Sequence, residues 1–154
     1  MIVRESLKLN EVGEANLRPY DFYIDDEGAA FQDWIEYKFM TEDRDKYVVN
    51  FVKRKDYWIV QYSLSGRGKK LKHEVVVNKG RNYRVMSTVT QIIKHFISQH
   101  HPEKMIMSAA KSKDEDKRRL HMYLRYLEKN ITTEYTFRTE TTPNDDYLII
   151  IEKV

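Results

Sequence analysis

Strand-like patterns of apolar and polar positions occupy the first half of the chain. Residues 35–39 alternate between apolar and polar side chains, which is the period of a half-buried strand. Polar turns separate this predicted strand from the strand-like runs that follow it, and residues 65–68 form one such turn with two glycines. Runs rich in β-branched and aromatic residues predict further strands at residues 47–53, 57–64, 71–77 and 82–86. The first half is therefore expected to form consecutive hairpins.

A helical period replaces the strand period after residue 88. Either Ser87 or Thr88 is suited to cap this helix, because a hydroxyl accepts a hydrogen bond from a first-turn amide. Pro102 disfavours a helical residue before it, so the helix is expected to end near residue 100. The apolar residues that follow the spacing of one helix face are Val89, Ile92, Ile93, Phe96 and Ile97.

A second helix and three short strands complete the pattern. Ser112 and Glu115 have the spacing of a capping box, which predicts a helix from residue 112 to about 129. The expected fold class is α+β, a mixed and mainly antiparallel sheet with two covering helices in the order ββββ(β)αβαββ. We expect an acidic N-terminal arm over residues 1–30 and a single α+β domain over residues 31–154. The three strands are predicted at residues 104–109, 134–138 and 147–152.

The composition excludes several classes of protein. The 154 residues include no cysteine, which removes disulfide scaffolds, thiolate zinc sites and cysteine nucleophiles. No apolar run approaches the roughly 18 residues that a bilayer span needs, so no membrane partner is expected. The five histidines lack the spacing of a zinc site, and the sequence predicts neither a metal nor a cofactor. Because the N-terminus lacks a secretory signal, we expect a cytoplasmic location.

Charge is distributed unevenly along the chain. Residues 1–45 carry 5 basic and 12 acidic side chains, whereas residues 46–84 carry 11 basic and 2 acidic ones. The second segment therefore has a net charge of +9, and such a field attracts anionic partners. The acidic segment could instead fold back and neutralise it. Both interpretations remain open from the sequence.

Basic residues in the second segment concentrate at turns and strand ends, with aromatic residues between them. Phosphates pair with cations while bases stack on rings, so this combination suits single-stranded nucleic acid, either RNA or DNA. The alternative is that the rings belong to the core and the cations only solvate turns and edges. The candidate nucleic-acid-binding residues are Lys53, Arg54, Lys55, Tyr57, Trp58, Tyr62, Arg67, Lys69, Lys70, Lys72, Lys79, Arg81 and Arg84.

The second predicted helix carries a candidate anion site. Arg119 and Tyr123 are four residues apart and therefore share a helix face, with Arg118 beside them. An arginine directed at the sheet is able to hold a phosphate or a buried carboxylate. The alternative is a purely structural ion pair. No catalytic residue is assigned from these patterns.

One family resemblance rests on two short motifs. The segment Arg84-Val85-Met86-Ser87-Thr88-Val89 leads into a helix, and the second helix carries Arg119-x-x-x-Tyr123. This pattern resembles small, uncharacterised phage-encoded proteins over roughly residues 46–130. The resemblance implies a viral origin, hence a location in the infected host cell, and it implies no chemistry.

A second resemblance lies in the order of elements. Strand hairpins, helix, strand, helix and two final strands are similar to the C-terminal part of GNAT acyltransferases. That family binds the pyrophosphate of acyl-CoA on backbone amides at a glycine-rich turn before a helix. The matching segment here, 84–89, contains no glycine, and its side chains would obstruct close approach of the backbone.

The sequence favours a non-enzymatic phage protein that binds single-stranded nucleic acid through its basic, aromatic-bearing strands. One alternative is a GNAT-like acyltransferase with a degenerate cofactor loop. Another is a protein-interaction or virion-assembly module. A host or viral protein is a candidate partner, and the acidic arm and basic face of two copies would permit a homo-oligomer.

Overall fold

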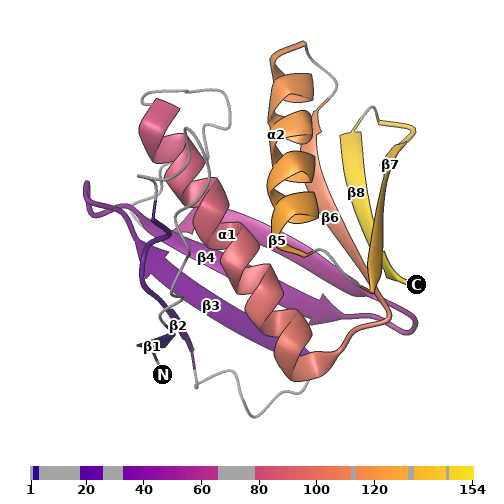
Figure 1. The fold of residues 1–154 in the computed structure, drawn as a ribbon, viewed down its shortest axis with the longest axis horizontal. Helices are drawn as coiled ribbons and strands as arrows, with labels where there is room; N and C mark the ends of the chain where they lie inside the picture. Colours follow the sequence, from indigo (N-terminus) through magenta and orange to yellow (C-terminus); the bar gives the residue numbers. More distant parts are fainter. Residues whose placement is uncertain are drawn as a thin grey trace.

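Two helices lie against one face of a mixed β-sheet (Figure 1). The structure is a computed structural model that describes residues 2–3, 18–25, 33–65, 79–111, 114–131, 134–144 and 146–154. The fold class and the order of elements predicted from the sequence are confirmed. The elements are β1 (Ile2–Val3), β2 (Phe22–Ile24), β3 (Trp34–Met40), β4 (Lys46–Lys53), β5 (Trp58–Ser65), α1 (Lys79–His100), β6 (Lys104–Lys111), α2 (Asp114–Asn130), β7 (Tyr135–Thr141) and β8 (Asp146–Lys153).

The strands are ordered β1-β2-β3-β4-β5-β6-β8-β7 across the sheet. Every neighbouring pair is antiparallel except β5 and β6, which are parallel. Parallel neighbours need a crossover connection, and α1 lies in the chain between these two strands. The sheet therefore consists of an antiparallel half from β1 to β5 and an antiparallel half of β6, β8 and β7.

The core lies between the helices and one face of the sheet. Val60 of β5 is paired with Met107 of β6, and Met107 is paired with Ile149 of β8, so these residues form a row across both halves. All three are fully buried. The row continues to Phe51 of β4, whose ring stacks on Phe96 of α1 with centroids 3.9 Å apart. Burial of these large apolar side chains is the main stabilising contribution.

No helix among the described elements packs on the opposite face of the sheet. Val52, Ile59 and Ile106 are aligned across β4, β5 and β6 on that face, and each is only half-buried. Trp34 of β3 is paired with Val52 and is 43% exposed. The sheet is therefore packed on one side and partly open on the other.

The first helix begins earlier than predicted. Residues 82–86, predicted to be a strand, lie inside α1, and this prediction is wrong. Val85 is four residues before Val89, so the apolar stripe of the helix already includes it, and a short run of five residues fits either period. The strand predicted at 71–77 lies outside the described residues. Neither described helix has the length and hydropathy of a membrane span.

Part of the predicted N-terminal arm belongs to the folded body. β2 pairs with β3 in antiparallel register, with Phe22 opposite Phe39. Phe22 and Tyr20 are both buried, and the Tyr20 ring stacks on that of Phe39. Residues 18–25 are therefore held by the sheet and by the core. Residues 1, 4–17 and 26–30 of the arm lie outside the described part of the chain.

Candidate functional site

The parallel strands β5 and β6 pair over a short distance and then separate. Their register holds three residue pairs, of which Val60 with Met107 is the last. Past this point β5 stays paired with β4 up to Ser65, and β6 stays paired with β8 up to Lys111. Figure 1 shows the two halves of the sheet diverging. We call the three pairs the seam and the divergence beyond them the split.

Both helices begin at the end of the sheet where the split lies. α2 starts at Asp114, shortly after β6 ends at Lys111. In α1, Arg84 contacts Glu42, which precedes β4, and the first residue of β4 is paired with the last residue of β5. In open α/β sheets, ligands bind beyond the carboxyl ends of parallel strands, near such helix starts. The split is therefore the candidate functional site.

Two tyrosine rings meet beside the split. Tyr62 lies two residues past Val60 on the helix-covered face of β5, and Tyr123 projects from α2. Their centroids are 5.8 Å apart with an interplanar angle of 64°, which is an edge-to-face contact. Tyr123 is 2% exposed and Tyr62 is half-buried. The sequence analysis assigned both residues to sites, but in separate ones, and the structure brings them together.

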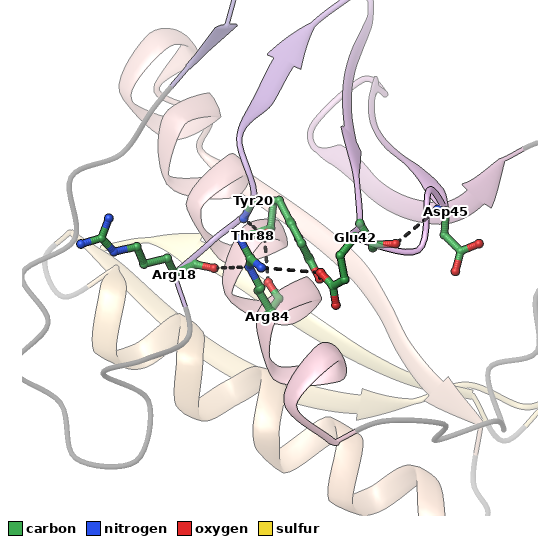
Figure 2. A network of polar contacts seen from close by, with 7 residues as sticks. Arg18, Tyr20, Glu42, Asp45, Arg84 and Thr88 are labelled. Carbon is green, nitrogen blue, oxygen red and sulfur yellow. Dashed lines mark hydrogen bonds and ion pairs between the residues drawn. The ribbon is translucent and has the colours of Figure 1, made fainter.

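Arg84 of α1 joins three segments of the chain (Figure 2). Its Nε donates a 2.7 Å hydrogen bond to the carbonyl oxygen of Arg18, and its Nη1 lies 3.5 Å from the Glu42 carboxylate. Its guanidinium carbon lies 4.0 Å from the centroid of the Tyr20 ring. The Tyr20 hydroxyl donates to the same carboxylate, and the Tyr20 amide donates to Thr88 Oγ1 over 2.8 Å. We call these five residues the clasp.

The clasp corrects the predicted role of Arg84. Its guanidinium contacts an aromatic face, a carboxylate and a carbonyl oxygen, so Arg84 has partners within the protein itself. An arginine held in this way fixes the N-terminal segment on α1. Sequence analysis missed Tyr20 and Glu42, because a pair separated by 22 residues leaves no periodic pattern.

Four of the predicted basic residues have described side chains, and they lie at two ends of the sheet. Lys53, Arg54 and Lys55 are exposed in the turn from β4 to β5. This turn is at the opposite end of β4 from the clasp, because Lys53 is paired with the first residue of β5. Arg84 is therefore a full strand length away from them.

Two of the predicted aromatic residues are part of the packing. Trp58 contacts the Phe96 ring edge-to-face at 4.9 Å, with the Lys53 ammonium 5.9 Å from its ring. Tyr57 is half-buried in the turn before β5. Arg67, Lys69, Lys70 and Lys72 lie outside the described residues. Lys79 and Arg81 are in the first turn of α1, and Arg118 and Arg119 are in α2, but the described side chains do not include these four.

The predicted cofactor turn is not a turn. Residues 84–89 lie within α1 and are buried from Val85 onward. The helix begins five residues before Arg84, so the position corresponding to a helix start is Lys79-Gly80. Gly80 lacks the Cβ that would keep a ligand away from the backbone. Sequence analysis compared residues 84–89 with the glycine-rich cofactor turn of acyltransferases. The comparable helix start is Lys79-Gly80, so the absence of glycine at 84–89 does not bear on cofactor binding.

A second polar pair lies in the core of the first half-sheet. The Tyr37 hydroxyl and His95 Nδ1 are 2.7 Å apart, and the Phe22 and Phe51 rings pack around Tyr37. Burial raises the pKa of Tyr37 well above its ordinary value, so this phenol stays protonated at neutral pH. The pair connects β3 to α1 and was missed by sequence analysis, which considered the histidines only as metal ligands.

Comparison with known proteins gives structural neighbours. No family model and no curated protein matches the chain. A ribosomal-protein-S5-alanine acetyltransferase from Vibrio fischeri is similar with a TM-score of 0.51 and 11% identity, over 82% of this chain and 65% of that one. This chain thus spans less than two thirds of that enzyme. A spermidine N-acetyltransferase chimera of Vibrio cholerae has a TM-score of 0.49 at 6% identity, over 84% of this chain and 71% of that one. An acetyltransferase of the GNAT family from Bacteroides thetaiotaomicron has a TM-score of 0.42 at 10% identity, over 84% of this chain and 67% of that one.

The likeness to the Vibrio fischeri enzyme shows a shared fold. This finding overturns the main functional prediction, a non-enzymatic phage protein that binds RNA or DNA, and with it the viral and RNA-binding description. That prediction was drawn from the distribution of charge along the sequence, which carries no information about the fold. The resemblance to phage proteins stays a prediction. The topological resemblance to acyltransferases, which had been the alternative, fits the structure better.

Proposed function

We propose that the chain is an acyltransferase that uses a coenzyme A thioester and acylates an amine. The observation that carries this proposal is the split between β5 and β6, which lies in a sheet that shares its fold with an acetyltransferase. Fold alone does not assign chemistry, so the proposal depends on what the split offers a ligand. Three of its properties support a thioester: backbone edges, helix starts and a buried phenol.

The backbone edges suit an extended ligand that carries amides. Beyond Val60 and Met107 the facing edges of β5 and β6 no longer pair with one another. The pantetheine arm of coenzyme A is extended and has two amide groups, so it is able to pair with a strand edge as an added strand does. The seam closes the inner end of such a site, and Val60 and Met107 at that end are fully buried.

The helix starts suit the phosphates. α1 has no acidic residue in its first turn, and its sequence there is Lys79-Gly80-Arg81. Unpaired amides at a helix start carry a partial positive charge and bind phosphate groups. Cations in the first turn of a helix are unfavourable without a bound anion. A diphosphate at this position would remove that disadvantage.

The buried phenol suits the leaving group. In the proposed reaction, the amine nitrogen forms a bond to the thioester carbonyl carbon, the carbon–sulfur bond breaks, and the thiolate takes up a proton. Tyr123 is a buried ionisable side chain on the helix side of the split, in contact with the half-buried Tyr62. We assign it the role of proton donor to the sulfur. Solvent takes up the proton that the nitrogen loses and returns a proton to the Tyr123 phenolate, so the step balances.

Binding is tested by thermal denaturation with acetyl-CoA, with ADP as the matched anion that lacks the pantetheine arm. The melting temperature is expected to rise with acetyl-CoA, because a ligand at a hundred times its Kd stabilises by about 2.7 kcal/mol. ADP is expected to give a smaller rise. An unchanged melting temperature at millimolar acetyl-CoA would remove the proposal.

The role of Tyr123 is tested separately by following free thiol released from acetyl-CoA in the presence of a panel of primary amines. The panel contains a peptide with a free N-terminus and a diamine. Tyr123→Phe is expected to lower kcat by about a hundredfold, since a positioned proton donor contributes factors of that order, while acetyl-CoA still binds. A variant with wild-type turnover would remove Tyr123 from the mechanism and leave the binding proposal intact.

A further inference from the structure

Tyr62 occupies a distinctive position on β5. It is the first residue on the helix-covered face after the seam, since the parallel register ends at Val60 and Met107 and Tyr62 lies two residues further along β5. On the other side, Tyr62 is paired with Val49 of β4. On the helix side, the ring of Tyr123 contacts it from α2.

The contact restricts how the Tyr123 ring is oriented. Tyr123 belongs to the buried stripe of α2, and Leu120 and Leu127 lie on the same stripe one turn before and after it. These neighbours hold its backbone and Cβ. The ring itself is buried in the core, so its angle about the Cβ–Cγ bond is set by the side chains packed on its faces and edges. The edge-to-face contact with Tyr62, with rings at 64°, favours one orientation.

We propose that Tyr62 is a positioning residue whose ring sets the orientation of the Tyr123 phenol at the split. The effect of Tyr62 on turnover rests on the proposed function, whereas the contact between the two rings does not. A proton donor must be held within a fraction of an ångström of its acceptor to be effective. Tyr62 therefore contributes to the rate of the step that Tyr123 serves and not to the binding of the thioester. The positioning depends on the ring, so a phenylalanine at 62 preserves it.

The kinetic test is a double-mutant cycle with a conservative control. Tyr62→Leu is expected to lower kcat by roughly threefold to tenfold, the factor that corresponds to the free energy of one aromatic pair, with the KM for acetyl-CoA nearly unchanged. Tyr62→Phe is expected to keep the wild-type kcat. In the Tyr123→Phe background, Tyr62→Leu is expected to have no further effect. An equal loss in both backgrounds would overturn the proposal and leave the proposed function standing.

The structural test needs no ligand and no turnover. In protein labelled with ¹³C-tyrosine, the Tyr123 ring resonances carry the ring-current shift of the residue at position 62. They are expected to move in Tyr62→Leu and to stay close to their wild-type positions in Tyr62→Phe. If Tyr62→Leu leaves them in place, Tyr62 does not orient the phenol, whatever the activity. Failure of acetyl-CoA to bind would instead remove the proposed function, and the resonances would still report on the contact.

Discussion

Thr88 and Thr90 are neighbours on α1 whose buried hydroxyls have different partners. Thr88 Oγ1 donates to the Arg84 carbonyl oxygen and also accepts the Tyr20 amide. Thr90 Oγ1 donates to the carbonyl oxygen of Met86, within the helix. One hydroxyl therefore holds another segment of the chain, and the other supports only its own helix. The two residues form a matched pair for testing the clasp.

Thr88→Val is expected to lower the free energy of unfolding by about 1–3 kcal/mol, because it leaves the Tyr20 amide without its acceptor in a buried position. Thr90→Val is expected to change it by less than about 0.5 kcal/mol, since the Met86 carbonyl keeps its helical hydrogen bond. Urea denaturation measures both values. Hydrogen exchange at the Tyr20 amide should accelerate in the first variant alone. Equal losses in the two variants would show that Thr88 does not hold the N-terminal segment.

Single residues were the level at which the sequence was least informative. Arg84 was identified as a cation near a helix, but its partners Glu42 and Tyr20 come from segments far away in the chain. Tyr62 and Tyr123 were each identified, yet their contact across 61 positions has no counterpart in the sequence pattern. Side-chain partners across a sheet are set by register and by how strands diverge. Neither property is written in local periodicity.

At the scale of elements, the C-terminal end of α1 shows two opposing influences on one histidine. His100 lies in the last turn, where the helix dipole stabilises a cation. The rings of Phe96 and Trp58 lie 4.6 and 6.0 Å from its own ring. Burial against them, together with the nearby His95 and His101, lowers the pKa of His100 below its ordinary value. Desolvation therefore outweighs the dipole at this helix end.

This arrangement predicts acid sensitivity. A group whose pKa is lowered in the folded state contributes its full stability above its unfolded value, near 6.5, and loses it as the pH falls through the folded value. His100→Gln is expected to flatten the dependence of unfolding free energy on pH below about 6.5. His121→Gln, on the exposed side of α2, serves as the control. Identical pH profiles for the wild type and His100→Gln would contradict the prediction.

Elements with a long, strict period were predictable, and their boundaries were not. The stripe from Val89 to Ile97 indicated α1 correctly, whereas its start was placed eight residues or more too late. Ser87 and Thr88, expected to cap the helix, are buried inside it. A hydroxyl that suits a cap also suits a buried position where another segment supplies a donor. Thr88 occupies the buried position and accepts the Tyr20 amide there, which is a tertiary contact that local sequence does not reveal.

At the scale of the whole molecule, the covered and open faces of the sheet predict opposite tolerance to polar substitution. Val60 faces the helices and is fully buried, whereas Val52 faces the other way and is half-buried. Val60→Thr is expected to lower the free energy of unfolding by about 1–3 kcal/mol through burial of a hydroxyl. Val52→Thr is expected to cost less than about 0.5 kcal/mol. Urea denaturation distinguishes the two, and equal costs would mean that both faces are covered.

The parallel seam divides the sheet into two halves that are synthesised one after the other on the ribosome. The strands β3, β4 and β5 and the helix α1 emerge before β6, and they pair and pack with one another. Residues 104–153, which form the second half-sheet and α2, take about 3–10 s to synthesise at typical bacterial and eukaryotic rates. During that interval β5 does not yet have β6 beside it, and this side of β5 resembles an edge strand. The nascent chain is therefore most vulnerable to mispairing at the strand that later forms one wall of the split.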